Sequence, residues 1–450
     1  MTTVRDGATI HDIPAEDVFF STTDRKGVIF QANDMFVRMA RRDRNQLVGA
    51  PHSIIRHPDM PAGAFHLLWN RLLDGEPVAA YVLNQAGDGS AYWAFGTIAP
   101  LGSGFLSVRC RPTRLDLFAA ADAIYREVRP MEIETRAAGV PAREAARMGA
   151  EALEAHLASV GFTSYDDFMM AAAPAEVASR RALFPALPSR PHAQGVQATM
   201  LQTANQIDTT LAPLAEALGT SAETGATIEN RLQYASGSVH QLLDALADAS
   251  AVIVTKAEEE PMLAQAATSL TDQIRSVSAS LDTSYTHVQA VATSRKRLNF
   301  VVAIARLQAE MVGQYVIALI DGKESAADSD DAIRGLSQAL SSILTNTELA
   351  LTEDAAATSS LAGDIDSVSN TLRIVQMLLT KWRGLLASRN LTDSLGEILP
   401  RLDAALTEVT SAVTEVRSGS EALTSTVVGF NRSELQNYLA VLTHTMAGAR

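Results

Sequence analysis

The chain has 450 residues and a formal net charge of −14 at pH 7, so it can hold several domains and is not expected to bind nucleic acid. Its single cysteine, Cys110, excludes internal disulfides and suits a reducing, cytoplasmic location. Residues 1–17 are polar and lack a signal-peptide pattern. The most apolar stretch, 298–320, is interrupted by Arg306 and Glu310, so no membrane-spanning helix is expected.

The first hundred residues alternate strand-like and helix-like segments. β-branched and aromatic runs on either side of a turn predict a hairpin at the start, and Asn33 is a suitable N-cap for the helix that follows. The expected elements, in chain order, are strands at 18–22 and 28–30, helices at 35–40 and 64–73, and strands at 78–84, 91–98 and 104–111.

A proline-rich run at residues 51–61 separates the two helices. Its three prolines favour short helical turns and loops over a strand or a long helix. Within it lie His52, Arg56, His57 and Asp59, which are charged or ring side chains. A stiff connection of this kind can hold such groups over a cavity, and it is the most informative segment of the chain.

The order of these elements resembles the PAS fold, and several short motifs are similar to those of the flavin-binding PAS domain of bacterial aerotaxis receptors. The resemblance implies a PAS sensor domain over residues 15–114, an α+β fold with a five-stranded antiparallel sheet and helices. The motifs are Ser-Thr-Thr-Asp at 21–24, Ala-Asn-Asp-Met-Phe-Val at 32–37, Arg-His-Pro-Asp-Met-Pro at 56–61, Phe65, Trp69, Gly-Glu-Pro at 75–77 and Tyr-Trp at 92–93.

The resemblance implies FAD, held non-covalently between the helices and the sheet. Arg56 would be a permanent cation for the pyrophosphate, Trp69 a flat face for stacking, and Asn84 an amide that can follow a change of protonation at a flavin nitrogen. One departure is Val78, which stands where flavin-binding relatives carry tryptophan. The six residues implied to contact FAD are Asn33, Arg56, His57, Asp59, Trp69 and Asn84.

Several of these residues also have a purely structural interpretation. Asn33 can serve only as a helix cap, Trp69 can be a core residue of an apolar helical stripe, and Asp59 can brace its own loop. Cys110 is expected on the last strand, which argues against a cysteine photoadduct, and the scattered histidines form no metal motif. No phosphate loop or nucleophile elbow is present in the sequence, so we expect no enzyme.

Residues 115–186 are expected to form a helical connector that transmits motion from the sensor domain. Three helices are predicted there, at 119–127, 142–160 and 164–183, with a small core that includes Phe168 and Met169. A linker at 187–195, rich in proline and glycine, then precedes a change in composition.

The region 196–450 is predicted to be all-α, because apolar residues recur there at heptad spacing in four runs that begin at Met200, Leu270, Leu361 and Leu402. Such a narrow apolar seam needs partner helices, either from the same chain or from a second copy. We therefore expect a coiled coil or helical bundle that signals and self-associates as a homodimer or larger assembly.

Two arrangements of these helices stay open. Breaks are expected near Pro261, Gly313, Gly322, Gly335 and Pro400. One antiparallel hairpin folded near residue 312, as in chemoreceptors, would match two arms of similar length; an irregular bundle with several turns is the alternative. Residues 298–310 resemble a degraded chemoreceptor tip, which implies chemotaxis-type signalling partners although most of the tip motif is missing.

The sequence thus predicts a soluble FAD-binding PAS sensor of oxygen, redox or energy state whose signal passes through helices. A cofactor-free PAS dimerisation module on a helical scaffold is the first alternative. A flavin-based light sensor is the second.

Overall fold

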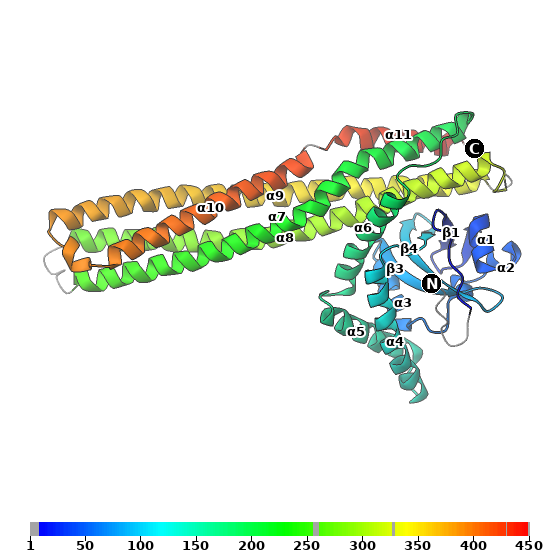
Figure 1. The fold of residues 1–450 in the computed structure, drawn as a ribbon, viewed down its shortest axis with the longest axis horizontal. Helices are drawn as coiled ribbons and strands as arrows, with labels where there is room; N and C mark the ends of the chain where they lie inside the picture. Colours follow the sequence, from blue (N-terminus) through cyan, green and yellow to red (C-terminus); the bar gives the residue numbers. More distant parts are fainter. Residues whose placement is uncertain (1–8, 255–260, 326–328, 429, 449–450) are drawn as a thin grey trace. The chain divides into compact units, whose positions relative to one another are not determined.

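The computed structural model describes residues 9–254, 261–325, 329–428 and 430–448. The chain forms two compact units, each built from segments that lie far apart in the sequence. The first unit consists of Met1–Ala215, Lys296–Leu349 and Asn431–Arg450, and the second of Glu216–Arg295 and Ala350–Phe430. The predicted fold class, an α+β domain followed by long helices, is confirmed (Figure 1).

The first unit contains a five-stranded antiparallel sheet with strand order β2-β1-β5-β4-β3. All five expected strands are present. The turn between β1 and β2 depends on Gly27, whose φ of 78° is readily adopted only by glycine. The strands are β1 (Val18–Asp24), β2 (Ile29–Ala32), β3 (Val78–Gln85), β4 (Ala91–Leu101) and β5 (Gly104–Cys110).

Short helices lie between β2 and β3 in the sequence. Asn33 caps the first of them, as predicted, by accepting a hydrogen bond from the backbone N–H of Phe36. The proline-rich run forms a short 3₁₀ helix and loops, which also agrees with its sequence. These elements are α1 (Asp34–Ala40), α2 (Arg44–Leu47), η1 (His52–Ile55) and α3 (Ala62–Leu73).

The connector forms three helices, α4 (Leu115–Ala137), α5 (Ala142–Ser159) and α6 (Tyr165–Leu183). Within the connector, Phe168 of α6 packs edge-on against Phe162, with ring centroids 5.1 Å apart. Phe168 and Phe118 of α4 also lie with ring centroids 6.2 Å and 5.9 Å from that of Tyr81 on β3. The connector thus covers aromatic residues on one face of the sheet.

The C-terminal region consists of long helices. Gly313 and Gly335, two of the expected breaks, lie inside helices, and residue 312 lies within α8, so the chain does not form the hairpin at residue 312 that was one of the two open arrangements. The irregular bundle with several turns is the arrangement observed. The elements are α7 (Gly195–Val254), α8 (Pro261–Ile320), α9 (Ser329–Ser388), η4 (Thr392–Leu395), α10 (Ile398–Val428) and α11 (Arg432–Gly448).

Gly313 serves packing rather than chain reversal. A Cβ atom added there would lie 2.1 Å from Cδ1 of Leu187, so the glycine lets the linker side chain approach the helix closely. The chain turns instead near Gly322, whose φ is 69°. Pro261 begins α8 and Pro400 lies in the first turn of α10, two positions where a proline is tolerated.

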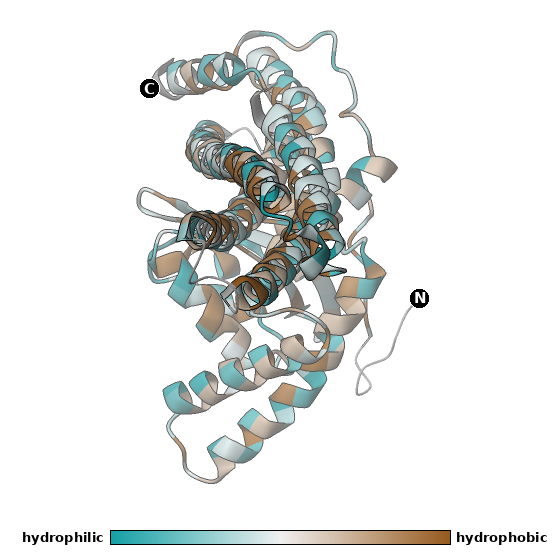
Figure 2. Ribbon diagram, turned by 90° about the vertical axis from the view of Figure 1, so that its left-hand side faces the viewer, coloured by the Kyte–Doolittle hydropathy of each residue, from teal (hydrophilic) through white to brown (hydrophobic). Residues whose placement is uncertain are grey.

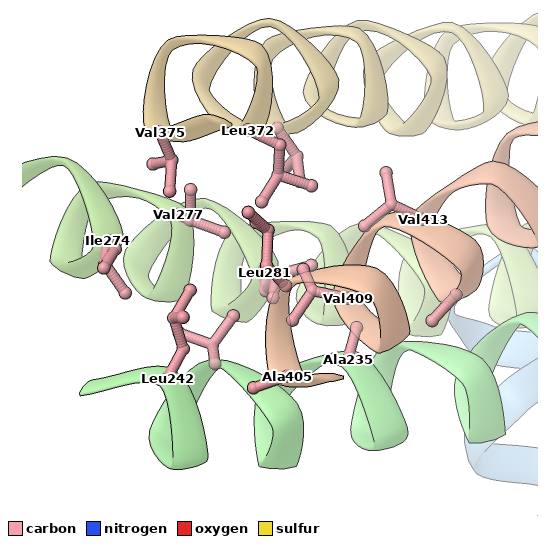
Figure 3. Close-up of a cluster of buried hydrophobic side chains, with 14 of the residues drawn as sticks. Ala235, Leu242, Ile274, Val277, Leu281, Leu372, Val375, Ala405, Val409 and Val413 are labelled. Atoms are coloured by element: carbon pink, nitrogen blue, oxygen red, sulfur yellow. The ribbon is translucent and has the colours of Figure 1, made fainter. Parts of the chain in front are cut away.

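In the second unit, segments of α7, α8, α9 and α10 share one hydrophobic core. Figure 3 shows side chains from these four helices pointing toward one another. In Figure 2, where these helices are seen nearly end-on, each carries both brown and teal residues. The heptad seams are therefore covered by helices of the same chain. Labelled members of the core are Ala235, Leu242, Ile274, Val277, Leu281, Leu372, Val375, Ala405, Val409 and Val413.

The segment similar to a chemoreceptor tip, residues 298–310, is buried within the first unit. Phe300, Val302 and Ile304 have no exposed surface. Among the described helices, α8 alone is long and apolar enough to cross a membrane by length and composition; its most apolar window has a mean hydropathy of 1.3 and is 94% buried in the protein. Core packing therefore accounts for its apolar character.

Helix α8 also contacts the sheet domain through polar groups. Arg180 of α6 and Glu310 of α8 form an ion pair of 2.7 Å in which the side chains are 1% and 2% exposed. Gln314 accepts a hydrogen bond from the backbone N–H of Val18, and Tyr315 lies edge-on to Phe20 at 5.3 Å. The sheet domain and this part of α8 thus form one packed body.

A pH-dependent contact joins the loop after α8 to the sheet domain. Both carboxylate oxygens of Glu324 accept from the backbone N–H of Asp34, at 2.9 Å and 3.0 Å. Burial raises the pKa of Glu324 to about 7, and the negative charge of Asp34 adds to the rise, although the hydrogen bond from the Asp34 backbone and the charges of Arg44 and Arg38 lower it. The folded protein thus binds a proton that the unfolded chain releases near pH 4.5.

Stability is therefore expected to fall as pH rises from about 4.5 to about 7, and Glu324→Gln should remove this part of the dependence. At pH 8 the variant should be more stable than the wild type, on the order of 1 kcal/mol because the side chain is only half-buried. Urea unfolding at pH 5 and pH 8 measures the effect, with Glu127→Gln on the exposed face of α4 as control. If the stability of Glu324→Gln differs between pH 5 and pH 8 by as much as that of the wild type, the prediction is wrong.

Candidate ligand site

A cavity of about 420 Å³ lies between the sheet and the helices η1 and α3. This volume is within the range of small-molecule sites in proteins. Side chains reach it from the β1–β2 turn, from the proline-rich run, from α3, and from one face of β3, β4 and β5. They include Lys26, Gly27, His52, Ile55, Arg56, Phe65, Leu68, Trp69, Ala80, Val82, Asn84, Gly96, Ile98, Phe105, Ser107 and Arg109.

The strand register explains why the space is open. Ala80 on β3 pairs with Gly96 on β4, and Gly96 pairs in turn with Arg109 on β5. Successive residues of a strand point to opposite faces, so these three lie in one row across the cavity face of the sheet. Because two of the three carry little or no side chain, the row leaves room above the sheet that Arg109 enters from one side.

Aromatic rings form part of the cavity wall. Trp69 of α3 lies edge-on to Phe105 of β5, with ring centroids 5.5 Å apart. Its six-membered ring also lies against Gly27, where an added Cβ would come within 3.1 Å. Trp69 therefore lines the cavity and also packs against its neighbours. This position is compatible with both interpretations of the residue, as a ligand contact and as a core residue.

Arg56 and Asn84, both predicted ligand contacts, meet at the other side of the cavity. Their backbones form an antiparallel bridge that fixes the proline-rich run to β3. The guanidinium of Arg56 lies 3.4 Å from the centroid of the Phe65 ring. Asn84 is 2% exposed, and its Nδ2 donates to the carbonyl of Val82 at 3.2 Å. A cation and an amide are thus held beside an aromatic surface.

The other three predicted residues lie outside this cavity. Asn33 accepts from the backbone N–H groups of Phe20 and Phe36, at 3.1 Å and 3.2 Å, so its side chain oxygen serves the fold. The Nδ1 atom of His57 accepts from the backbone N–H of Asp59 at 3.2 Å, which braces the loop next to Arg56. Of the six residues implied to contact FAD, the cavity therefore gathers Arg56, Trp69 and Asn84.

Six polar residues of the cavity were not among the predicted contacts: Thr23, Lys26, His52, Ser53, Ser107 and Arg109. The alternation of β5 could have indicated two of them, since Phe105, Ser107 and Arg109 occupy every second position. Within the described residues, the Ser107 hydroxyl and Nε of Arg56 are buried without a hydrogen-bond partner. Unpaired buried polar atoms at a cavity wall are suited to a polar ligand.

Electrostatics distinguish the Arg109 side of the cavity. Arg109 is 4% exposed, and burial lowers its pKa to about 10, so it stays charged at pH 7. It donates to the Ser21 hydroxyl at 3.2 Å and lies 2.6 Å from Nε2 of His52. Desolvation, and then the charge of Arg109, hold the pKa of His52 well below its usual value. His52 is therefore neutral and accepts at Nε2.

Cys110 lies on the opposite face of β5 from Arg109 and is buried. Burial raises the pKa of its thiol to about 12, so it is protonated and unreactive at neutral pH. In the described part of the chain, no cysteine lines the cavity. Val78 is fully buried at the start of β3 and is also outside the lining.

Comparison with known proteins gives one clear similarity. No protein-family model matches the chain. The aerotaxis receptor of Escherichia coli (strain K12) is 36% identical over 116 residues, which cover 25% of this chain and 23% of the receptor. The chain thus matches less than a quarter of the length of this curated relative.

Solved structures of LOV proteins are also similar. The LOV protein of Rhodobacter sphaeroides and the RsLOV d2 variant each share 19% identity and a TM-score of 0.21, covering 32% of this chain and 88% of theirs. The strand order described above and the identity to the aerotaxis receptor support the prediction of a PAS domain in the N-terminal α+β region. This region is similar to that of an aerotaxis-type receptor.

Proposed function

We propose that this chain is a cytoplasmic sensor whose PAS domain binds FAD and responds to oxygen, redox or energy state. The observation that carries the proposal is the cavity of about 420 Å³, which places Arg56, Trp69 and Asn84 around one space. The similarity to an aerotaxis receptor supports a signalling role over a catalytic one.

The residues around the cavity fit a flavin. The rings of Phe65, Trp69 and Phe105 supply apolar surface for a flat ring system. Arg56 and the exposed Lys26 supply positive charge for phosphates, and Ser107 and Asn84 supply polar groups for a ring edge. A bound flavin would supply reversible electron transfer. The residues of this chain bind it, orient it and shield it from water.

A connected set of polar contacts supports a route from the cavity strands to α8. Glu176 of α6 accepts from the Tyr81 hydroxyl at 2.7 Å and from the backbone N–H of Thr113, which follows β5, at 2.7 Å. One helical turn further along α6, Arg180 pairs with Glu310 of α8. A displacement of β3 or β5 would therefore act on α6 and, through it, on α8. Contiguous contacts of this kind can relay a change if they have two arrangements of similar energy.

The alternatives differ in what they require of the cavity. A cofactor-free dimerisation module needs no open cavity, and it would have to use surfaces other than the part of the sheet that α4 and α6 cover. A flavin light sensor would use the same cavity without a cysteine. Self-association through the helices stays a prediction, and it must use surfaces other than the heptad seams covered in the second unit.

The absorption spectrum of the purified full-length protein tests the proposal. We expect flavin absorption bands that bleach on reduction and return on exposure to air, with FAD released on denaturation. If the protein is colourless, it should bind added FAD at one equivalent. Illumination at constant oxygen separates a light response from a redox response. Failure to bind added FAD in the folded protein would overturn the proposal.

A further inference from the structure

The charges around the cavity are of one sign. Three cationic side chains line it: Lys26 in the β1–β2 turn, Arg56 in the proline-rich run and Arg109 on the central strand β5. No aspartate or glutamate is found among the described residues that line it. Lys26 is exposed, Arg56 is half-buried and Arg109 is 4% exposed, so the positive charge continues from solvent into the interior.

Among the described residues, the groups that contact the Arg109 side chain are neutral. Its guanidinium contacts the Ser21 hydroxyl and the neutral imidazole of His52, and it lies 6.0 Å and 5.4 Å from the ring centroids of Phe19 and Phe36. These groups satisfy hydrogen bonds and polarise toward the cation but do not cancel its charge. Buried charges in proteins are normally paired, because an uncompensated one is costly.

We infer that this cavity selects an aromatic anion and that Arg109 is the residue that determines the selection. Flat apolar rings are accommodated by Phe65, Trp69 and Phe105, while a negative group on the ligand meets the guanidinium of Arg109. His52 accepts from Arg109 at Nε2 and so positions the guanidinium toward the cavity. The inference concerns the same cavity as the proposed function but does not depend on FAD being its occupant.

Two fluorescent probes of matched shape test it with the full chain, after removal of any bound cofactor. Anilinonaphthalene sulfonate and phenylnaphthylamine share an aromatic skeleton, and only the first carries a negative charge. We expect the wild type to bind the sulfonate at least about tenfold more tightly than the neutral amine. Arg109→Met should lose about tenfold for the sulfonate, which corresponds to about 1.4 kcal/mol, and little for the amine. Arg109→Lys should retain part of the preference because it keeps the charge.

Controls separate this result from general effects. Arg111→Met removes an exposed cation that pairs with Asp12 and should leave both affinities unchanged. Gly96→Leu should block both probes if they bind in the cavity.

Equal binding of the two probes by the wild type overturns the inference even if Arg109→Met does not fold. An equal loss of affinity for both probes in Arg109→Met also overturns it. A sulfonate preference in a protein that rejects FAD would overturn the proposed function alone, and FAD binding without that preference would overturn the inference alone.

Discussion

Replacement of Arg180 by methionine is expected to destabilise the first unit by about 3–5 kcal/mol. The guanidinium donates to Glu310 at 2.7 Å and 3.0 Å and to the carbonyls of Ala15 and Glu16 at 2.6 Å each. Methionine fills similar volume but leaves the Glu310 carboxylate, which is 2% exposed, without its main partner. Removal of one member of a buried pair costs more than the pair contributes, because the remaining charge is desolvated.

Urea unfolding followed by tryptophan fluorescence measures this loss, since Trp69 and Trp93 both lie in the first unit. The double variant Arg180→Met/Glu310→Leu should recover most of the stability, because neither charge of the pair is left without its partner and Arg181 keeps its ion pair with Asp208 at 3.2 Å. Arg147→Met, which breaks an exposed pair with Glu144 on α5, is the matched control and should cost less than about 1 kcal/mol. A loss in Arg180→Met no greater than in this control would mean that the buried pair does not hold α6 to α8.

Gly96→Leu is expected to weaken FAD binding at least about 100-fold, or about 2.7 kcal/mol. An added Cβ at Gly96 would meet its nearest neighbour, Cγ of Arg109, at 3.6 Å, which is an ordinary contact. The backbone therefore accepts a side chain there. The remaining carbons of leucine must then occupy the cavity, where the row of Ala80, Gly96 and Arg109 otherwise leaves space for a ring.

Gly96→Ala is the matched control for this variant, and it should bind FAD within a few-fold of the wild type because its methyl group takes little of the 420 Å³. Equilibrium dialysis with FAD, with circular dichroism to verify folding, gives both affinities. Undiminished FAD binding by a folded Gly96→Leu protein would mean that the cofactor binds elsewhere on the chain.

The elements of the PAS domain could be predicted closely because local signals agree there. The hairpin residues, the Asn33 cap and the proline-rich run each determine their own backbone through short-range sterics and hydrogen bonds. Arg56, Trp69 and Asn84 could be placed in one cavity because a motif fixed their positions along the chain. Asn33 could not be excluded from the cavity by sequence, since a cap and a ligand contact use the same side chain oxygen.

Arg109 shows more clearly what could not be predicted from the sequence. The alternation of β5 indicates that Arg109 shares a face with Phe105 and Ser107, but whether that face is open depends on the helices that cover the sheet and on the neighbouring residues Ala80 and Gly96. The same holds for the turns of the helical region. The residue type of Gly313 predicts a helix break, but the glycine lies inside a helix and allows the Leu187 side chain to pack against it.

The sequence by itself determined the strand and helix types of the PAS domain, the connector helices and the heptad seams, because these follow from residue periodicity and backbone preference. Tertiary structure alone decided which helices cover those seams, that residues 298–310 are buried, and that Arg109 faces an open cavity whose described lining residues include no carboxylate. The physical reason is that burial and charge pairing depend on neighbours brought together from distant parts of the chain. A seam or an arginine carries no information about its partner until the chain has folded.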